Sequence, residues 1–74
     1  MQDIDKPIWI SHSGQWYLYP TYDPREFELE HRTRGTASCV FVDLDGFVHW
    51  TSEAVATVPK CVMRGVELFI RGVQ

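Results

Sequence analysis

The side chains best suited to ligate a metal ion or to act as nucleophiles are spread singly along the chain. They are His12, His31, Cys39, His49 and Cys61. Structural zinc sites usually draw ligands in pairs that are two to five residues apart, and none of these five residues has another at such a spacing. The sequence therefore predicts neither a metal site nor a bound cofactor.

A catalytic triad would need a serine or cysteine beside a histidine, with an acid that orients the histidine. Ser11, His12 and Ser13 bring the first two types together. Adjacent residues in a turn, however, rarely contact one another in the required geometry. The five glycines are isolated from each other, so the chain also lacks a glycine-rich phosphate loop. We expect the protein not to be an enzyme.

Two aspartates follow an apolar run in the segment Val40-Phe41-Val42-Asp43-Leu44-Asp45-Gly46. This segment resembles the first motif of the haloacid dehalogenase superfamily, which implies a nucleophile at Asp43 and a general acid at Asp45. That family also requires a much larger doubly wound domain and a distant acidic pair for magnesium. The 28 residues after Gly46 contain only two acids and cannot supply that domain. We therefore interpret both aspartates as turn residues and assign the chain to no family.

The four residues 43–46 lie between two runs of β-branched and aromatic residues, 38–42 and 47–51. A short turn that ends in Asp-Gly between such runs is a strong signal for a β-hairpin. Both faces of each run are largely apolar, which predicts a central hairpin covered on two sides.

Three more strands are predicted before this hairpin. Pro7 opens a short apolar strand over residues 8–10, and a turn at 11–14 leads to an alternating strand over 15–19. Residues 26–34 alternate throughout, with Phe27, Leu29 and His31 on one side and charged residues on the other. A turn at residues 35–36 then enters the hairpin. The pattern predicts a five-stranded antiparallel β-meander over residues 7–51.

The apolar period changes in the last third of the chain. Val62, Val66, Phe69 and Ile70 fall on one face of a helix. We expect an amphipathic helix over residues 59–71, with Pro59 at its first position and Gly72 at its end.

A glycine inside this predicted helix is unfavourable, because Gly65 costs about 1 kcal/mol relative to alanine. A sixth strand over residues 66–70 is therefore the alternative. Residues 52–56 are compatible with a short helical turn ahead of the helix.

The chain of 74 residues is predicted to form one small α+β domain. It has a frayed lead-in over residues 1–6, the β-meander over 7–51 and a C-terminal amphipathic helix laid on one face of the sheet. A partly closed five-stranded barrel with a terminal helix is the alternative architecture.

The chain is acidic, with a net charge of −3 and a pI near 5.4. Binding to phosphate backbones needs clustered positive charge, so nucleic acid is not the expected partner. No apolar run approaches a membrane span, and residues 1–5 are unlike a signal peptide. We expect a cytoplasmic protein with no membrane partner, in which Cys39 and Cys61 are reduced and buried.

Two groups of side chains are candidates for a partner-binding surface: the tyrosines Tyr17, Tyr19 and Tyr22, and the acidic stripe Glu26, Glu28 and Glu30. If Trp16 and Leu18 point into the core, their neighbours Tyr17 and Tyr19 point outward. Tyrosines offer large, rigid contact area, and a charged stripe can steer a partner. Coverage of the tyrosines by another element, and simple solvation of the charged stripe, are the alternatives.

We therefore expect a small non-enzymatic protein–protein interaction module. One form of this hypothesis is a phage or mobile-element inhibitor that occludes a larger host protein, and another is a homodimer formed through the same surface. The alternative function is binding of single-stranded nucleic acid, with the tyrosines stacking on bases and Arg25, Arg32 and Arg34 contacting the backbone.

Overall fold

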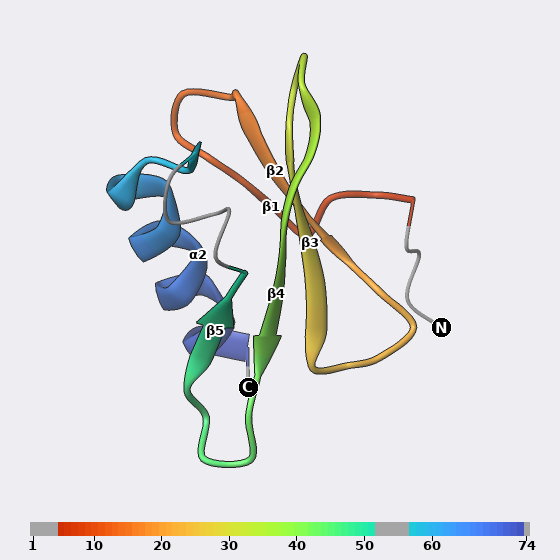
Figure 1. Ribbon diagram of the computed structural model, residues 1–74, viewed down its shortest axis with the longest axis vertical. Helices are drawn as coiled ribbons and strands as arrows, with labels where there is room; N and C mark the ends of the chain where they lie inside the picture. Colours follow the sequence, from red (N-terminus) through yellow and green to blue (C-terminus); the bar gives the residue numbers. More distant parts are fainter. Residues whose placement is uncertain (1–4, 52–56, 74) are drawn as a thin grey trace.

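The computed structural model describes residues 5–51 and 57–73, which form a five-stranded antiparallel sheet and one long helix (Figure 1). The strands are β1 (Trp9–Ile10), β2 (Trp16–Pro20), β3 (Glu26–His31), β4 (Gly35–Val42) and β5 (Val48–Trp50), and the helix is α2 (Lys60–Val73). The strands lie in the sheet in chain order.

This arrangement confirms the predicted α+β meander with a C-terminal helix. The sheet is open, because the described strands run from β1 to β5 with no pair that closes a barrel. Residues 1–4 of the expected lead-in and the expected turn at 52–56 lie outside the described residues.

The core lies between α2 and one face of the sheet. The strands contribute the buried side chains Trp16, Leu18, Phe27, Leu29, Val40 and Val42. The C-terminal segment contributes the buried side chains Val58, Val62, Val66 and Ile70. Alternate residues of each strand point to the opposite face, so the helix covers one face of the sheet and leaves the other uncovered by it (Figure 1).

The C-terminal segment is a helix and not the alternative sixth strand, and its details correct three predictions. The carbonyl of Pro59 accepts hydrogen bonds from the N–H groups of Val62 and Met63, so Pro59 precedes the first helical residue. Gly72 lies inside the helix, which continues to Val73. Phe69 was expected in the core but is only half-buried, because the buried stripe follows a spacing of four residues through Val66 and Ile70.

The hairpin of β4 and β5 was predicted to be central and covered on two sides, and this is wrong. β5 is the last strand of the sheet, and Phe41 on the uncovered face is 48 % exposed. Apolar residues on both faces of a strand therefore did not mean burial on both faces.

The predicted strand over residues 26–34 is shorter in the structure. β3 ends at His31 after an irregularity between Leu29 and Glu30, and residues 32–34 form the turn into β4. Gly35, the first residue of β4, has a φ of 81°, a conformation that glycine adopts at little cost. Arg32 and Arg34 consequently lie in the turn and do not extend the stripe of glutamates.

Gly65 of α2 lies directly against the side chain of Trp9 in β1. A Cβ atom at this position would lie 2.9 Å from Cζ2 of Trp9. The glycine that weakens the helix on propensity alone therefore lets the indole of Trp9 pack directly against the helix backbone.

Replacement of Gly65 by alanine is expected to destabilise the protein. Alanine gains about 1 kcal/mol in helix propensity, but forcing an extra methyl group into a packed contact typically costs about 1–3 kcal/mol. The free energy of unfolding of Gly65→Ala, measured by urea denaturation, should therefore fall by up to about 2 kcal/mol.

Gly72→Ala is the matched control, because nothing lies within 4 Å of the added methyl group at Gly72. This variant should be as stable as the wild type or slightly more so. A gain in stability at position 65 as large as the gain at position 72 would contradict the proposed contact with Trp9.

Candidate interaction surface

The uncovered face of the sheet places tyrosines beside glutamates. Across the β2–β3 pair, Tyr17 lies opposite Glu30 and Tyr19 lies opposite Glu28. All four side chains are half-buried, whereas their strand neighbours Leu18 and Leu29 are fully buried on the helix side. We call Tyr17, Tyr19, Glu28 and Glu30 the tyrosine–glutamate face. On this face, each of the two tyrosines on β2 lies next to a glutamate on β3.

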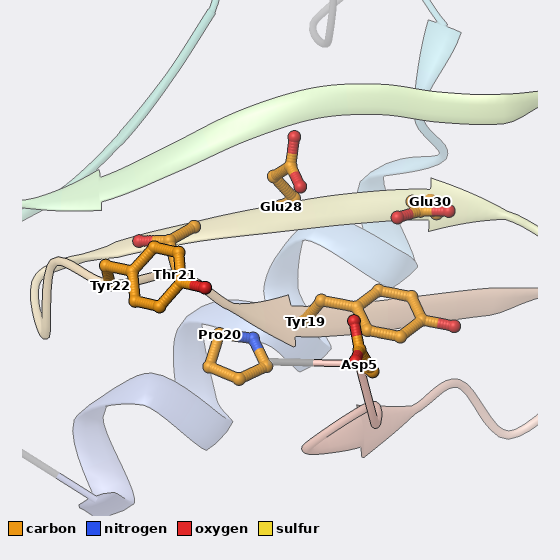
Figure 2. Close-up of a pocket in the computed structure, with 7 residues that line it drawn as sticks. All are labelled: Asp5, Tyr19, Pro20, Thr21, Tyr22, Glu28 and Glu30. Atoms are coloured by element: carbon orange, nitrogen blue, oxygen red, sulfur yellow. The ribbon is translucent and has the colours of Figure 1, made fainter. Parts of the chain in front are cut away.

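A groove of about 590 Å³ opens on this face (Figure 2). It is lined by Asp5, Tyr19, Pro20, Thr21, Tyr22, Glu28 and Glu30. Three acidic side chains and two tyrosines thus share one concave surface. The lining includes four of the six residues that the sequence singled out.

The other two predicted residues lie outside the groove. Tyr17 is on the same face of β2, further from the loop, and Glu26 is exposed at the start of β3, where it pairs with Phe41. Asp5 was missed by the sequence reasoning, because its position depends on the path of the chain before β1, for which no local pattern exists.

The loop between β2 and β3 is held by Thr21. The hydroxyl oxygen of Thr21 lies 3.0 Å from the carbonyl oxygens of both Asp23 and Glu26, and it accepts the N–H of Asp23 at 3.2 Å. The carboxylate of Asp23 in turn accepts the N–H of Arg25. This loop presents Tyr22, whose side chain is 91 % exposed.

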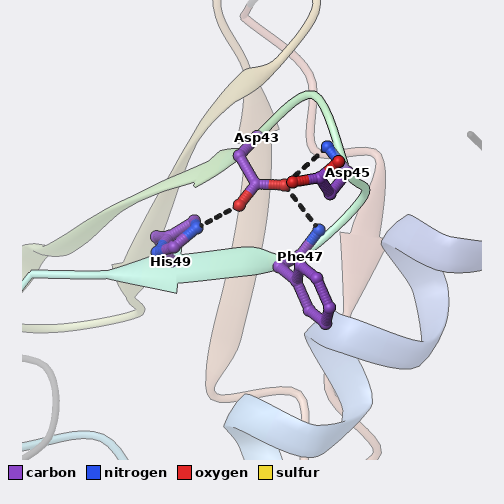
Figure 3. A network of polar contacts seen from close by, with 4 residues as sticks. All are labelled: Asp43, Asp45, Phe47 and His49. Carbon is purple, nitrogen blue, oxygen red and sulfur yellow. Dashed lines mark hydrogen bonds and ion pairs between the residues drawn. The ribbon is translucent and has the colours of Figure 1, made fainter.

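Asp43 organises the β4–β5 turn, which lies at the same end of the sheet as the β2–β3 loop (Figure 1 and Figure 3). Its Oδ1 atom accepts the backbone N–H groups of Asp45 and Phe47, both at 2.9 Å. Its Oδ2 atom accepts a hydrogen bond from Nε2 of His49 at 2.7 Å. The ring of His49 stacks on Phe41 with centroids 4.7 Å apart. Asp43 and Asp45 are turn residues, as the sequence analysis predicted. Both carboxylate oxygens of Asp43 accept hydrogen bonds from other residues of the hairpin.

The thiols and imidazoles do not assemble into a metal site in the part of the chain that the structure describes, where no three histidine, cysteine or acidic residues cluster. The cysteines were expected to be buried, and this is wrong. Cys39 is exposed on the uncovered face and Cys61 is exposed in the first turn of α2, both as free thiols. His31 instead packs against the edge of Trp16, with ring centroids 4.7 Å apart.

No family model, curated protein or solved structure matches this chain. Within the described residues, no helix combines the length and the apolar content that crossing a membrane requires.

The hydrogen bond between Asp43 and His49 should affect the stability of the folded protein at low pH. The hydrogen bond from His49, followed by those from the N–H groups of Phe47 and Asp45, lowers the pKa of the Asp43 carboxyl below its ordinary value of 3.8. A carboxyl with a lower pKa in the folded state contributes stability above its unfolded pKa, and this contribution is lost as the pH falls through the folded value.

His49→Ala should therefore raise the pKa of Asp43 towards 3.8 and reduce the loss of stability on acidification. Titration of the Asp43 carboxyl carbon by NMR in both proteins measures this shift. An unchanged midpoint in His49→Ala would show that His49 does not hold the carboxylate in solution.

Proposed function

We propose that the protein is a non-enzymatic interaction module that binds a basic surface of another protein through its tyrosine–glutamate face. The observation that carries this proposal is the register of β2 and β3, which sets each tyrosine beside a glutamate on the face that α2 leaves uncovered. Tyrosines supply rigid contact area, and carboxylates next to them select a partner with lysines or arginines.

The same register argues against the nucleic-acid alternative. Stacking of bases on Tyr17 and Tyr19 would bring phosphates close to Glu30 and Glu28, where like charges repel. Of the three arginines expected to contact the nucleic-acid backbone, Arg32 and Arg34 lie in the β3–β4 turn and not on the strand beside the tyrosines, and Arg25 is exposed in the β2–β3 loop. An acidic face therefore favours a basic protein over a polyanion.

A second copy of the chain is also a poor fit for this face. A symmetric dimer apposes the same patch on both subunits, so Glu28 and Glu30 of one copy would meet the same carboxylates of the other. The charge pattern therefore favours a different protein over self-association at this face.

The biological form of the proposal rests on analogy. Small acidic domains without a catalytic constellation commonly occlude a larger protein, and inhibitors carried by phages and other mobile elements are one such population. We extend the proposal to an inhibitor of this kind that acts in the cytoplasm on a host protein. Two unbridged, exposed cysteines suit the reducing conditions of that compartment.

The double variant Tyr17→Ala, Tyr19→Ala should remain folded and lose its partner, because neither tyrosine belongs to the buried core. Immobilised wild type and variant are used to capture proteins from a nuclease-treated host lysate, with identification by mass spectrometry. Proteins retained by the wild type and lost by the variant are the expected partners, and their contact surfaces should be basic.

Arg71→Ala serves as the matched control, since Arg71 is exposed near the end of α2, on the other side of the sheet. It should retain the same proteins as the wild type. With a captured partner, Glu28→Lys should slow association and weaken its dependence on salt. Equal capture by the folded double variant would exclude this face. Proteins captured from an untreated lysate but none from the nuclease-treated one would support the nucleic-acid alternative instead.

A further inference from the structure

The tyrosine–glutamate face repeats the same arrangement of two side chains twice. Tyr17 lies opposite Glu30, Tyr19 lies opposite Glu28, and the register of β2 and β3 is unbroken between them. Side chains directly opposite on paired strands have Cβ atoms about 4.5–5.5 Å apart, so each tyrosine and its glutamate form one local pair. Residues two apart on a strand lie on the same face, and the two pairs are therefore about 7 Å from each other along the strands.

The carboxylates of the two pairs have no partner in the part of the chain that the structure describes. No lysine, arginine or histidine of that part forms an ion pair with Glu28 or Glu30, and neither carboxylate accepts a hydrogen bond there. Both side chains are half-buried, so each carboxylate has lost part of its hydration without gaining a partner. A cation bound at each pair would replace the lost interaction with water.

The groove on this face has room for a side chain and for the backbone that carries it. Tyr19, Glu28 and Glu30 line the groove, and both glutamates project from β3 beside Tyr19 (Figure 2). Its volume of about 590 Å³ lies within the range of about 300–1,000 Å³ that is typical of ligand pockets. None of the described residues that line it is basic. The charge of the groove therefore complements a cationic occupant.

A guanidinium group fits a tyrosine–glutamate pair better than an ammonium group does. The guanidinium is planar, so it can stack on an aromatic ring while its edge donates two hydrogen bonds to a carboxylate. The ammonium of lysine is compact and strongly hydrated, and it gains less from a site that is only half-buried. Each pair is therefore suited to one arginine side chain.

The spacing of the two pairs determines where the arginines should lie in the partner. Alternate residues of an extended chain point to one side and are also about 7 Å apart, whereas adjacent residues point to opposite sides. We propose that the tyrosine–glutamate face binds an extended segment of a different protein that carries arginines at alternate positions, with one guanidinium on each pair. This inference rests on the proposed function and names the element by which the basic partner is recognised.

The chain itself has two arginines at this sequence spacing, Arg32 and Arg34. They lie in the turn between β3 and β4 and not in an extended segment, so their side chains do not follow the alternation of a strand. A second copy of the chain is therefore not the expected occupant.

Two peptides of identical composition and charge test the spacing. They are acetyl-Gly-Arg-Ala-Arg-Ala-Gly-amide and acetyl-Gly-Arg-Arg-Ala-Ala-Gly-amide, and both are too short to form a stable helix. Titration into the isotope-labelled protein at low ionic strength, where charges are least screened, gives each Kd by NMR. The alternating peptide should bind with a Kd of about 1 mM and shift the ring signals of Tyr17 and Tyr19. It should bind about fivefold more tightly than its isomer, the factor that corresponds to one cation–π contact.

A lysine version of the alternating peptide tests the preference for a guanidinium. Acetyl-Gly-Lys-Ala-Lys-Ala-Gly-amide has the same charge and spacing, and it should bind more weakly than the arginine peptide.

Two variants of the protein test whether both pairs are used. Glu30→Gln removes the charge of one pair and keeps its shape, so the preference for the alternating arginine peptide over its isomer should disappear. Glu26→Gln is the matched control, because Glu26 is exposed on the same strand and has no β2 residue opposite it. The preference should persist in this control, although both affinities should fall slightly with the lost charge. A preference that persists in Glu30→Gln, or disappears in Glu26→Gln, would contradict the proposal.

Other outcomes separate this proposal from the wider one of a basic partner. Equal affinities of the two arginine isomers, or of the arginine and lysine peptides, would overturn the alternating-arginine segment and leave a basic partner standing. Absence of any shift at Tyr17 and Tyr19 up to about 10 mM peptide would also overturn it, and lysate capture with the tyrosine double variant decides the wider proposal independently. Ring shifts that depend on protein concentration without peptide would assign the face to a second copy and overturn both.

Discussion

Four aliphatic side chains of the C-terminal segment, Val58, Val62, Val66 and Ile70, form one buried cluster with the strands, and the rest of the structure depends on this contact. A meander of five strands exposes two faces, and one helix can cover only one of them. Within residues 5–51 and 57–73, α2 is the one long helix, and it lies on one face of the sheet (Figure 1). The face of the sheet on which α2 packs therefore determines which strand side chains are buried in the core and which remain accessible.

The uncovered face differs in character along the sheet. Over β2 and β3 it carries tyrosines interleaved with glutamates, and over β4 and β5 it carries Phe41 stacked on His49. The β2–β3 loop and the β4–β5 turn are held by backbone N–H groups that donate to side chains, to Thr21 in the loop and to Asp43 in the turn. These bonds fix exposed residues that the core does not reach.

Much of this fold could be predicted from the sequence, because the signals for it are local. Strict alternation in residues 26–31 and the four-residue spacing of valines in α2 each report one buried face, and Asp45-Gly46 reports a hairpin. The relation between elements could not be predicted in this way. Nothing local shows that β5 is an edge strand, so the apolar Phe41 was taken to be covered. Gly65 was counted against the helix on propensity alone. Its contact with Trp9 could not be predicted, because Trp9 is distant in the sequence.

The candidate site was predicted to a similar extent and for the same reason. Period-two alternation placed Tyr17 and Tyr19 opposite the core, and the structure agrees. The pairing of each tyrosine with a particular glutamate depends on strand register, and the place of Asp5 in the groove depends on the path of the chain. Both are tertiary properties. A basic partner could therefore not be inferred from the sequence alone, because the inference depends on which side chains lie beside the tyrosines.

The central claim is that α2 covers one face of the sheet and leaves the tyrosine–glutamate face open in solution. Relaxation of side-chain NMR signals by a soluble, uncharged paramagnetic probe tests it directly. The ring signals of Tyr17 and Tyr19 should broaden strongly, while the methyl signals of Leu18, Leu29 and Val66 should remain sharp. Tyrosine signals as protected as those of the three buried aliphatic residues would show that this face is covered and would contradict the account.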